Sequence, residues 1–257
     1  MSALLLALAL LAQTASSPAP APTLPPPMSD ARKQRIATLD ALLSKRDYLA
    51  LRNAIESATS REEFKDSLDW ERDRTLGGSS AFLDIHYAQD LAALAKSAES
   101  KGDDLLGTAG LASLIAIAMI RSDGAHCADQ TAVGHRIDQV LGMNPAIWAH
   151  LKILPEAQRR ELASLIVAYE AGVAARRPPD GDAPFVCRGG MKEMIAGLAA
   201  GHVKKVPTPP GGVGTTYEVG TSDALPATVE PAIWKPRQEQ ARAELPKLLA
   251  DLLDLKP

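Results

Sequence analysis

The chain has 257 residues, of which 46% are hydrophobic, 23% are charged and only 4% are aromatic. This balance is typical of a globular protein and excludes an intrinsically disordered one. The formal net charge is -3, so the overall charge does not favour a nucleic-acid partner.

The first seventeen residues have the pattern of a secretory signal peptide. Residues 3–12 are a run of leucine and alanine, and small residues follow up to Ser17. The run is too short to cross the roughly 30 Å hydrocarbon layer of a membrane as a helix. The pattern departs from the usual one because no Lys or Arg precedes the apolar run. We predict export to the periplasm or the extracellular space, with residues 1–17 removed.

A proline-rich linker is predicted over residues 18–28. Six of the ten residues from Pro18 to Pro27 are proline, a composition typical of an extended polyproline-type spacer. No cysteine lies near residue 20, where a lipoprotein would carry its lipid. The mature protein is therefore expected to be soluble, with residues 29–257 forming a single α-helical domain.

The first half of that domain is predicted to be a helical array. No proline occurs between Met28 and Asn144, and proline is the residue that most strongly disrupts a helix interior. Ser60 and Glu63 form a capping box, the sequence signature of a helix start. From apolar periodicity and caps, helices are predicted over 30–44 and 47–58, from Ser60 to Gly77, and from Ser79 or Ser80 through Leu94.

The segment from Leu105 to Ile120 is the most apolar part of the domain. It is bounded by Asp104 and Arg121, and it is shorter than the roughly 20 residues that a spanning helix needs. A helix that is apolar on all sides is typical of the core of a soluble bundle. We predict a core helix and keep a membrane span as the alternative.

The second half of the domain is richer in proline and glycine. Its periodicity and caps predict helices near 133–142, from Pro145, from Pro155 to Arg177, from Met191 to Gly201 and from Arg237 to Leu255. Residues 180–189 are predicted to be a loop. The segment 202–236 is predicted to be irregular, with a small hairpin between Val203–Val206 and Thr215–Val219. The fold class is thus all-α, an irregular bundle of about eight to ten helices.

The two cysteines, Cys127 and Cys187, lie in predicted loops after long helices. In an oxidising compartment an even number of cysteines favours a disulfide. In the chain-entropy model, closing a loop of about 61 residues stabilises the fold by roughly 4 kcal/mol. Two free buried thiols are one alternative, and metal or redox chemistry is another, although the chain has no Cys-x-x-Cys motif.

His86 and Asp90 are the first candidate for chemistry. They lie four residues apart on a predicted helix, so they share one face and can pair. A histidine supported by a carboxylate is a general base of the kind that hydrolases use. No Gly-x-Ser-x-Gly motif supplies a nucleophile. His86 and Asp90 are therefore weak catalytic candidates, and a surface ion pair is the simpler interpretation.

A second polar cluster surrounds Cys127. His126, Asp129 and His135 are residues of the kinds that ligate zinc, but their spacing matches no established metal motif. Asp129 is equally well explained as a helix N-cap and His135 as a solvent-facing helix residue. His126 with Asp129 is a further weak catalytic pair. We expect neither a metal nor another cofactor.

The run from Asp69 to Arg74 places alternating charges around a tryptophan. Such charges usually pair with their neighbours on a solvated face, and Trp70 is then expected at the edge of the core. The alternative is a groove in which Trp70, Arg72 and Arg74 face an anionic or peptide ligand.

Taken together, these patterns predict an exported, soluble protein that acts as a binding or structural module of the cell envelope. An enzyme is not favoured, because no catalytic constellation stands out from the simpler interpretations. The alternative is an envelope hydrolase that uses His86 with Asp90 or His126 with Asp129. The expected partner is a protein or a peptide, with no nucleic acid and no stable membrane span in the mature chain.

Overall fold

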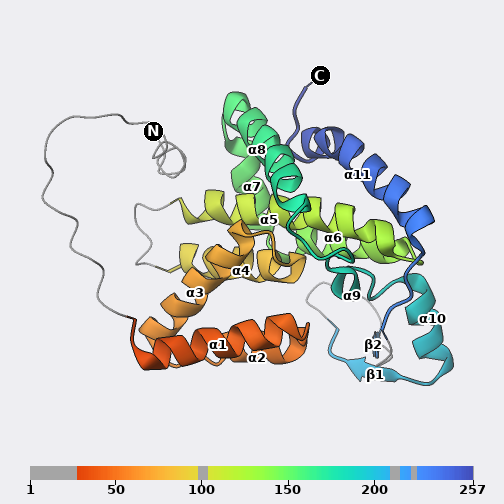
Figure 1. Cartoon of the computed structure of the whole chain (residues 1–257), viewed down its shortest axis with the longest axis horizontal. Coiled ribbons are helices and arrows are strands. Elements are labelled where there is room, and N and C mark those ends of the chain that lie inside the picture. The colour runs from red at the N-terminus through yellow and green to blue at the C-terminus, as the bar shows by residue number, and fades with distance from the viewer. Residues whose placement is uncertain (1–27, 98–103, 209–214, 221–224, 257) are drawn as a thin grey trace, which may run out of the picture.

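A computed structural model describes residues 28–97, 104–208, 215–220 and 225–256. This part of the chain is all-α, with one small antiparallel hairpin, as the sequence predicts (Figure 1). The predicted signal peptide and linker lie outside the described residues. The helices and strands are α1 (Asp30–Ser44), α2 (Tyr48–Glu56), α3 (Arg61–Leu76), α4 (Ala81–Ala95), α5 (Leu105–Asp123), the 3-10 turn η3 (Gly124–His126), α6 (Thr131–Met143), α7 (Pro145–Ile153), α8 (Glu156–Ala174), α9 (Ala183–Val186), α10 (Met191–Ala199), β1 (Val203–Val206), β2 (Thr216–Val219) and α11 (Pro231–Leu252).

Helix α5 is the centre of the bundle. It packs against α4, α6, α7, α8 and α11, which surround it in Figure 1. The stretch Leu105–His126 is the one helical stretch of the described residues that is long and apolar enough to cross a membrane, and 72% of its apolar window is buried inside the protein. Such burial is expected of a core helix, because its apolar surface is already covered by other helices.

A second, smaller core lies between α1, α2, α3 and α4. Its buried members come from all four helices and are Leu39, Leu51, Ile55, Trp70 and Leu83. Helices α3 and α4 begin directly after the predicted N-cap residues Ser60 and Ser80. Ser60 accepts a hydrogen bond from the backbone N–H of Glu63, and the Glu63 side chain accepts one in return, which completes the capping box.

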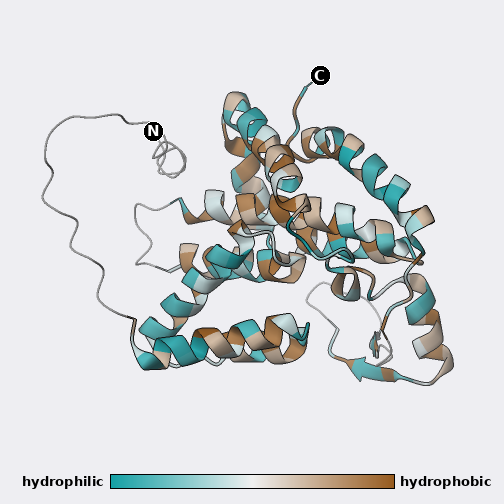
Figure 2. Cartoon of the chain, in the orientation of Figure 1, coloured by the Kyte–Doolittle hydropathy of each residue, from teal (hydrophilic) through white to brown (hydrophobic). Residues whose placement is uncertain are grey.

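Residues 188–220, as far as the structure describes them, form a small lobe that we call the hairpin lobe. It consists of α10 and the strands β1 and β2, which pair in the register Val203 with Val219 (Figure 1). Helix α10 packs closely on β2, because a Cβ atom at Gly197 would lie 2.7 Å from the Gly220 carbonyl oxygen. The apolar side chains of α10 that the sequence places at helical spacing are exposed, and Figure 2 shows the apolar ribbon of this helix.

Two sequence predictions of local structure are wrong. Residues 180–189 are not only a loop, because α9 forms a helical turn within them. The last helix begins at Pro231 rather than near residue 237. Both helices have proline in their first turn, where its missing N–H costs no hydrogen bond.

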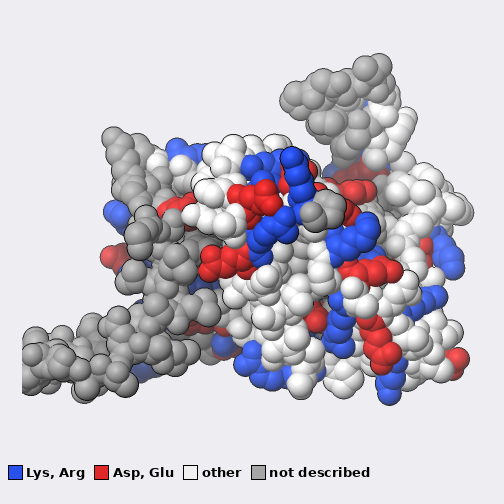
Figure 3. Space-filling model, turned by 90° about the horizontal axis from the view of Figure 1, so that it is seen from above, with Lys and Arg blue, Asp and Glu red and all other residues white. Residues whose placement is uncertain are grey.

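Charged side chains are mixed on the surface rather than sorted by sign. On the face shown in Figure 3, acidic and basic groups lie beside one another. Many form helix-surface pairs, such as Arg160 with Glu156 at 2.6 Å. Exposed pairs of this kind contribute little stability, so the buried charges are the informative ones.

Candidate metal centre

Three side chains of metal-ligating type meet between α3 and α4. Glu71 comes from α3, and His86 and Asp90 come from α4. The Nδ1 atom of His86 lies 2.7 Å from a Glu71 carboxylate oxygen and 3.7 Å from an Asp90 oxygen. The three ligand atoms lie within 4.8 Å of one another, and no other group of three such residues comes together in the described part of the chain.

The local structure explains why these groups converge. His86 and Asp90 are one helical turn apart and so project from the same face of α4. Glu71 lies on the buried face of α3, between Ser67 and Thr75 at spacings of four residues. Because α3 packs against α4, the Glu71 carboxylate on the buried face of α3 lies next to the His86 ring on α4.

Glu71 is the most unusual member of the cluster. Its exposed fraction is 0%, and its closest polar contact among the described residues is the Nδ1 atom of His86 at 2.7 Å. Burial raises the pKa of Glu71 to about 7, although the adjacent His86 opposes the rise. Burying a carboxylate is costly unless its charge is balanced, so this position favours a proton or a neighbouring cation.

The other members of the cluster also have shifted pKa values. Burial alone would lower the pKa of His86, but the carboxylates of Glu71, Asp90 and Glu56 outweigh burial and raise it. Burial raises the pKa of Asp90, with His86 opposing. The Nε2 atom of His86 lies 4.0 Å from Glu56. Both ring nitrogens therefore face carboxylates.

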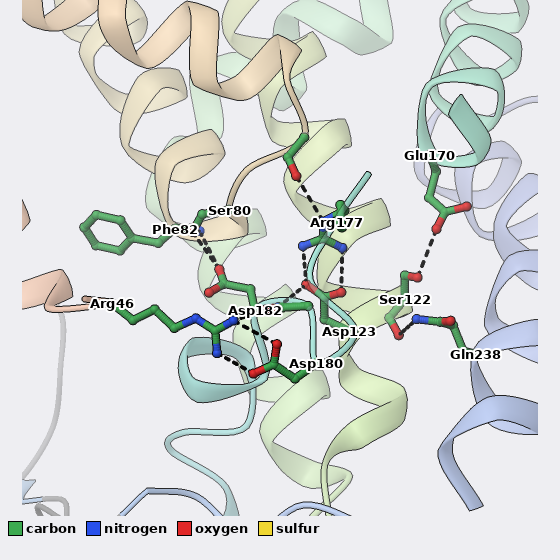
Figure 4. A network of polar contacts seen from close by, with 12 residues as sticks. Arg46, Ser80, Phe82, Ser122, Asp123, Glu170, Arg177, Asp180, Asp182 and Gln238 are labelled. Atoms are coloured by element: carbon green, nitrogen blue, oxygen red, sulfur yellow. Dashed lines mark hydrogen bonds and ion pairs between the residues drawn. The ribbon is translucent and has the colours of Figure 1, made fainter. Parts of the chain in front are cut away.

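A second set of buried charges lies at the start of α4, where the loop 178–182 meets α5 (Figure 4). Arg177 donates to both oxygens of Asp123 at 2.5 Å and also to the Gly78 carbonyl oxygen at 3.0 Å. Asp123 accepts a further hydrogen bond from the backbone N–H of Asp182. Asp182 in turn accepts hydrogen bonds from the hydroxyls of Tyr48 and Ser80. We call this set the Asp123 network.

The Asp123 network joins four parts of the chain through satisfied hydrogen bonds. It links the start of α2, the start of α4, the end of α5 and the loop before α9. Arg46 adds an ion pair with Asp180 at 2.5 Å on the surface side (Figure 4). Burial raises the pKa of Asp182 to about 6, with the Tyr48 hydroxyl opposing. Since its partners come from the protein itself, this network has a structural role.

Asp84 is a buried carboxyl group of a different kind. It is 0% exposed, and burial raises its pKa well above its usual range against the opposing effects of Thr75 and Arg177. Asp84 is not part of any group of three metal-ligating side chains in the described residues, so we interpret it as a buried acid of the core.

The second polar cluster of the sequence does not assemble into a site in the described structure. His126 is buried and stacks on Trp234, with ring centroids 4.2 Å apart. Asp129 accepts hydrogen bonds from the backbone N–H groups of Thr131 and Lys192 instead. His135 is exposed, and its Nε2 atom lies 3.1 Å from the side-chain nitrogen of Gln139. The placement of His126 on Trp234 does not support a catalytic pair with Asp129.

The charged run around Trp70 pairs within the chain. Trp70 is 3% exposed and donates its indole N–H to Asp40 at 2.9 Å. Arg74 pairs with the same carboxylate, and Arg72 pairs with Asp69. These contacts match the predicted pairing with neighbours and do not support a groove, because Trp70 is a core residue.

Cys127 and Cys187 lie together, as the sequence predicts. Their sulfur atoms are 2.11 Å apart and their Cα atoms 5.1 Å apart, within the range of a disulfide. The pair connects the end of η3 to the end of α9. It therefore fastens the base of the hairpin lobe to the segment that follows the central helix.

Glu71 and Glu56 were not predicted from the sequence as site residues. Glu71 lies in the run of alternating charges from Asp69 to Arg74, a pattern that is typical of a solvated face. The available signal was the spacing of Ser67, Glu71 and Thr75, which places them on one face of a helix beside Trp70. Comparisons with known proteins add no further assignment: no family model, curated protein or solved structure matches the chain.

Proposed function

We propose that this protein binds a divalent transition-metal ion through Glu71, His86 and Asp90. The observation that carries the proposal is the Glu71 carboxylate, which is wholly buried and whose closest polar contact in the described structure is an imidazole nitrogen 2.7 Å away. A metal ion between these groups would supply the missing interactions for Glu71. It would also balance the two carboxylate charges that the cluster carries when His86 is neutral.

The donor set limits the kind of metal. One imidazole nitrogen with two carboxylates suits Zn²⁺, Mn²⁺ or Fe²⁺, whereas Ca²⁺ and Mg²⁺ prefer sites made only of oxygen. The present separations of 2.7 and 3.7 Å from His86 Nδ1 bracket the spacing of about 3.4 Å expected between ligands around a tetrahedral zinc ion. Small side-chain adjustments would bring them to that spacing.

Glu56 completes the arrangement. In metal sites the ligating histidine usually donates its second ring N–H to a carboxylate, which fixes the tautomer. Glu56 lies on that side of His86, 4.0 Å from Nε2. Glu56 is also about half exposed, and the Asp90 side chain is 20% exposed. The cluster thus has a side that is open to water and to an arriving ion.

The same geometry gives less support to an envelope hydrolase that uses His86 and Asp90. A general base needs one ring nitrogen directed at the group that it deprotonates. Here Nδ1 faces Glu71 and Asp90, while Nε2 faces Glu56. We therefore assign His86 as a ligand rather than as a base.

The test is a calorimetric titration of the purified, metal-free protein with Zn²⁺, Mn²⁺ and Ca²⁺ at pH 7.5. We expect one equivalent of Zn²⁺ or Mn²⁺ to bind and Ca²⁺ to bind far more weakly. Glu71→Gln and His86→Asn should each weaken binding by about 100-fold or more. His150→Asn is the matched control, because His150 lies on α7, outside the cluster, and pairs with Asp104 at 3.1 Å. A wild type that binds no ion, or an unchanged affinity in both site variants, would contradict the proposal.

We further propose that the protein is exported and works in the cell envelope or outside the cell. The leucine-alanine leader and the proline-rich spacer support export, and the cysteine pair at disulfide distance is consistent with an oxidising compartment. Mass spectrometry of the protein from the envelope fraction should give an N-terminus near residues 16–20. A mature protein that retains Met1 would contradict export and leave the metal test unaffected.

A further inference from the structure

A cavity of about 520 Å³ lies between α6 and the hairpin lobe, far in sequence from the metal ligands. Its wall includes His135, Arg136 and Gln139 from α6, Met194 from α10, and Tyr217 and Val219 from β2. This volume is in the range of sites that hold small organic molecules.

Arg136 is the distinctive group of this wall. Its guanidinium lies over the Phe185 ring, 4.1 Å from the ring centroid. It donates to the side-chain oxygen of Gln139 at 2.7 Å and to the Phe185 carbonyl oxygen at 3.0 Å. All these acceptors are neutral. The carboxylates of Asp182 and Glu193 act on Arg136 only through their charge, and no carboxylate among the described residues forms an ion pair with it. Its buried Nε atom has no hydrogen-bond partner there.

The cavity wall also carries other charges, of both signs. Arg188 pairs with Glu193 at 2.9 Å, and Glu193 also accepts from the Gly189 backbone N–H at 2.7 Å. Glu218 also lines the cavity, and it lies opposite Lys204 in the hairpin register. Arg136 is thus the lining arginine that forms no ion pair with a described carboxylate. A guanidinium stays protonated in proteins, and a half-buried cation without a counter-ion is costly.

The remaining wall is suited to an apolar group. Met194 and Val219 face the cavity from two elements of the hairpin lobe, and Tyr217 adds an aromatic ring. Methionine and aromatic side chains adapt well to small apolar ligands. The cavity therefore combines one cationic anchor with a flexible apolar surface.

We propose that this cavity binds a small organic carboxylate with an apolar body, anchored by the Arg136 guanidinium. The carboxylate would accept the donors that Arg136 does not use within the protein, and the apolar body would cover Met194 and Val219. The site is built from α6, α10 and β2, whereas the metal cluster is built from α3 and α4. Either site can therefore be present without the other.

The test is a calorimetric titration of the full-length, oxidised protein with benzoate and hexanoate. Benzamide is the uncharged analogue of benzoate, and inorganic phosphate is the compact anion. We expect one equivalent of benzoate or hexanoate to bind, and benzamide to bind at least about tenfold more weakly because it lacks the charge. Absence of binding by both carboxylates at millimolar concentration would overturn the proposal. Tighter binding of phosphate than of either carboxylate would overturn the assigned ligand class.

Variants separate the anchor from the cavity. Arg136→Gln should weaken benzoate binding by about tenfold or more, whereas Arg121→Gln, which changes a surface arginine paired with Glu244, should not. Met194→Trp fills the cavity and leaves Arg136 in place, so it should block binding even if Arg136→Gln fails to fold. Unchanged affinity in Met194→Trp would place the ligand elsewhere and overturn the site.

Discussion

The start and the middle of helix α4 carry buried charges that are satisfied in different ways. At its start, Asp182 and Asp123 accept hydrogen bonds from side chains and backbone of three segments of the chain. In its middle, the Glu71 carboxylate is equally buried, and its closest polar contact in the described structure is the His86 imidazole at 2.7 Å. A network that the protein completes by itself holds a fold together, whereas one left incomplete points to a ligand from outside.

The Asp123 network gives the largest expected effect. Arg177→Met leaves the Asp123 carboxylate, 1% exposed, without its bidentate partner. We expect the free energy of unfolding to fall by about 3–5 kcal/mol, as measured by urea denaturation. The double variant Arg177→Met with Asp123→Leu should recover much of the loss. If the single variant is as stable as the wild type, the network does not hold the loop 178–182.

The cysteine pair spans nearly the same segments as the Asp123 network. Reduction, or the double variant Cys127→Ser with Cys187→Ser, should lower the free energy of unfolding by about 2–4 kcal/mol. The number of bound metal ions should not change, because the ligands lie on α3 and α4. Thiol titration of the denatured, unreduced protein should find no free thiol. Two free thiols would show that the bond is not formed.

In the metal cluster, removing a buried charge should raise the free energy of unfolding instead of lowering it. Burial holds the folded-state pKa of Glu71 near 7, so its ionised form is disfavoured and the metal-free protein loses stability as the pH rises from about 4.5 to 7. Glu71→Gln removes that penalty. We expect it to stabilise the metal-free protein by about 1–3 kcal/mol at pH 8 and by little at pH 5. A loss of stability at pH 8 would mean that the Glu71–His86 contact is itself stabilising.

The smallest expected effect is the pH dependence of metal affinity. A metal ion competes with protons for Glu71 and His86, and both groups have raised pKa values. Affinity for Zn²⁺ should therefore rise by about tenfold or more between pH 6 and pH 7 and level off above pH 8. Titrations at fixed ionic strength across this range measure it. An affinity independent of pH would show that the metal uses other groups.

The sequence predicts the fold well and the site poorly, for a physical reason. Helix periodicity and the Ser60 capping box are local patterns, so they can be predicted from the sequence. The cysteine pairing can be predicted as well, because the chain has only two cysteines. The partner of His86 is not local, because Glu71 reaches it only when α3 packs on α4. Glu71 also lies next to the exposed charges Arg72 and Asp73. Only the packed structure shows that the Glu71 side chain is buried while those two are not.

The most direct test of the central claim is anomalous X-ray scattering at the zinc edge, from crystals of the oxidised protein grown with one equivalent of Zn²⁺. We predict a single strong peak about 2.0–2.2 Å from His86 Nδ1 and from oxygens of Glu71 and Asp90. The peak should be lost in crystals of Glu71→Gln. Crystals of the wild type with no peak at this cluster, or with the zinc bound elsewhere, would contradict the account.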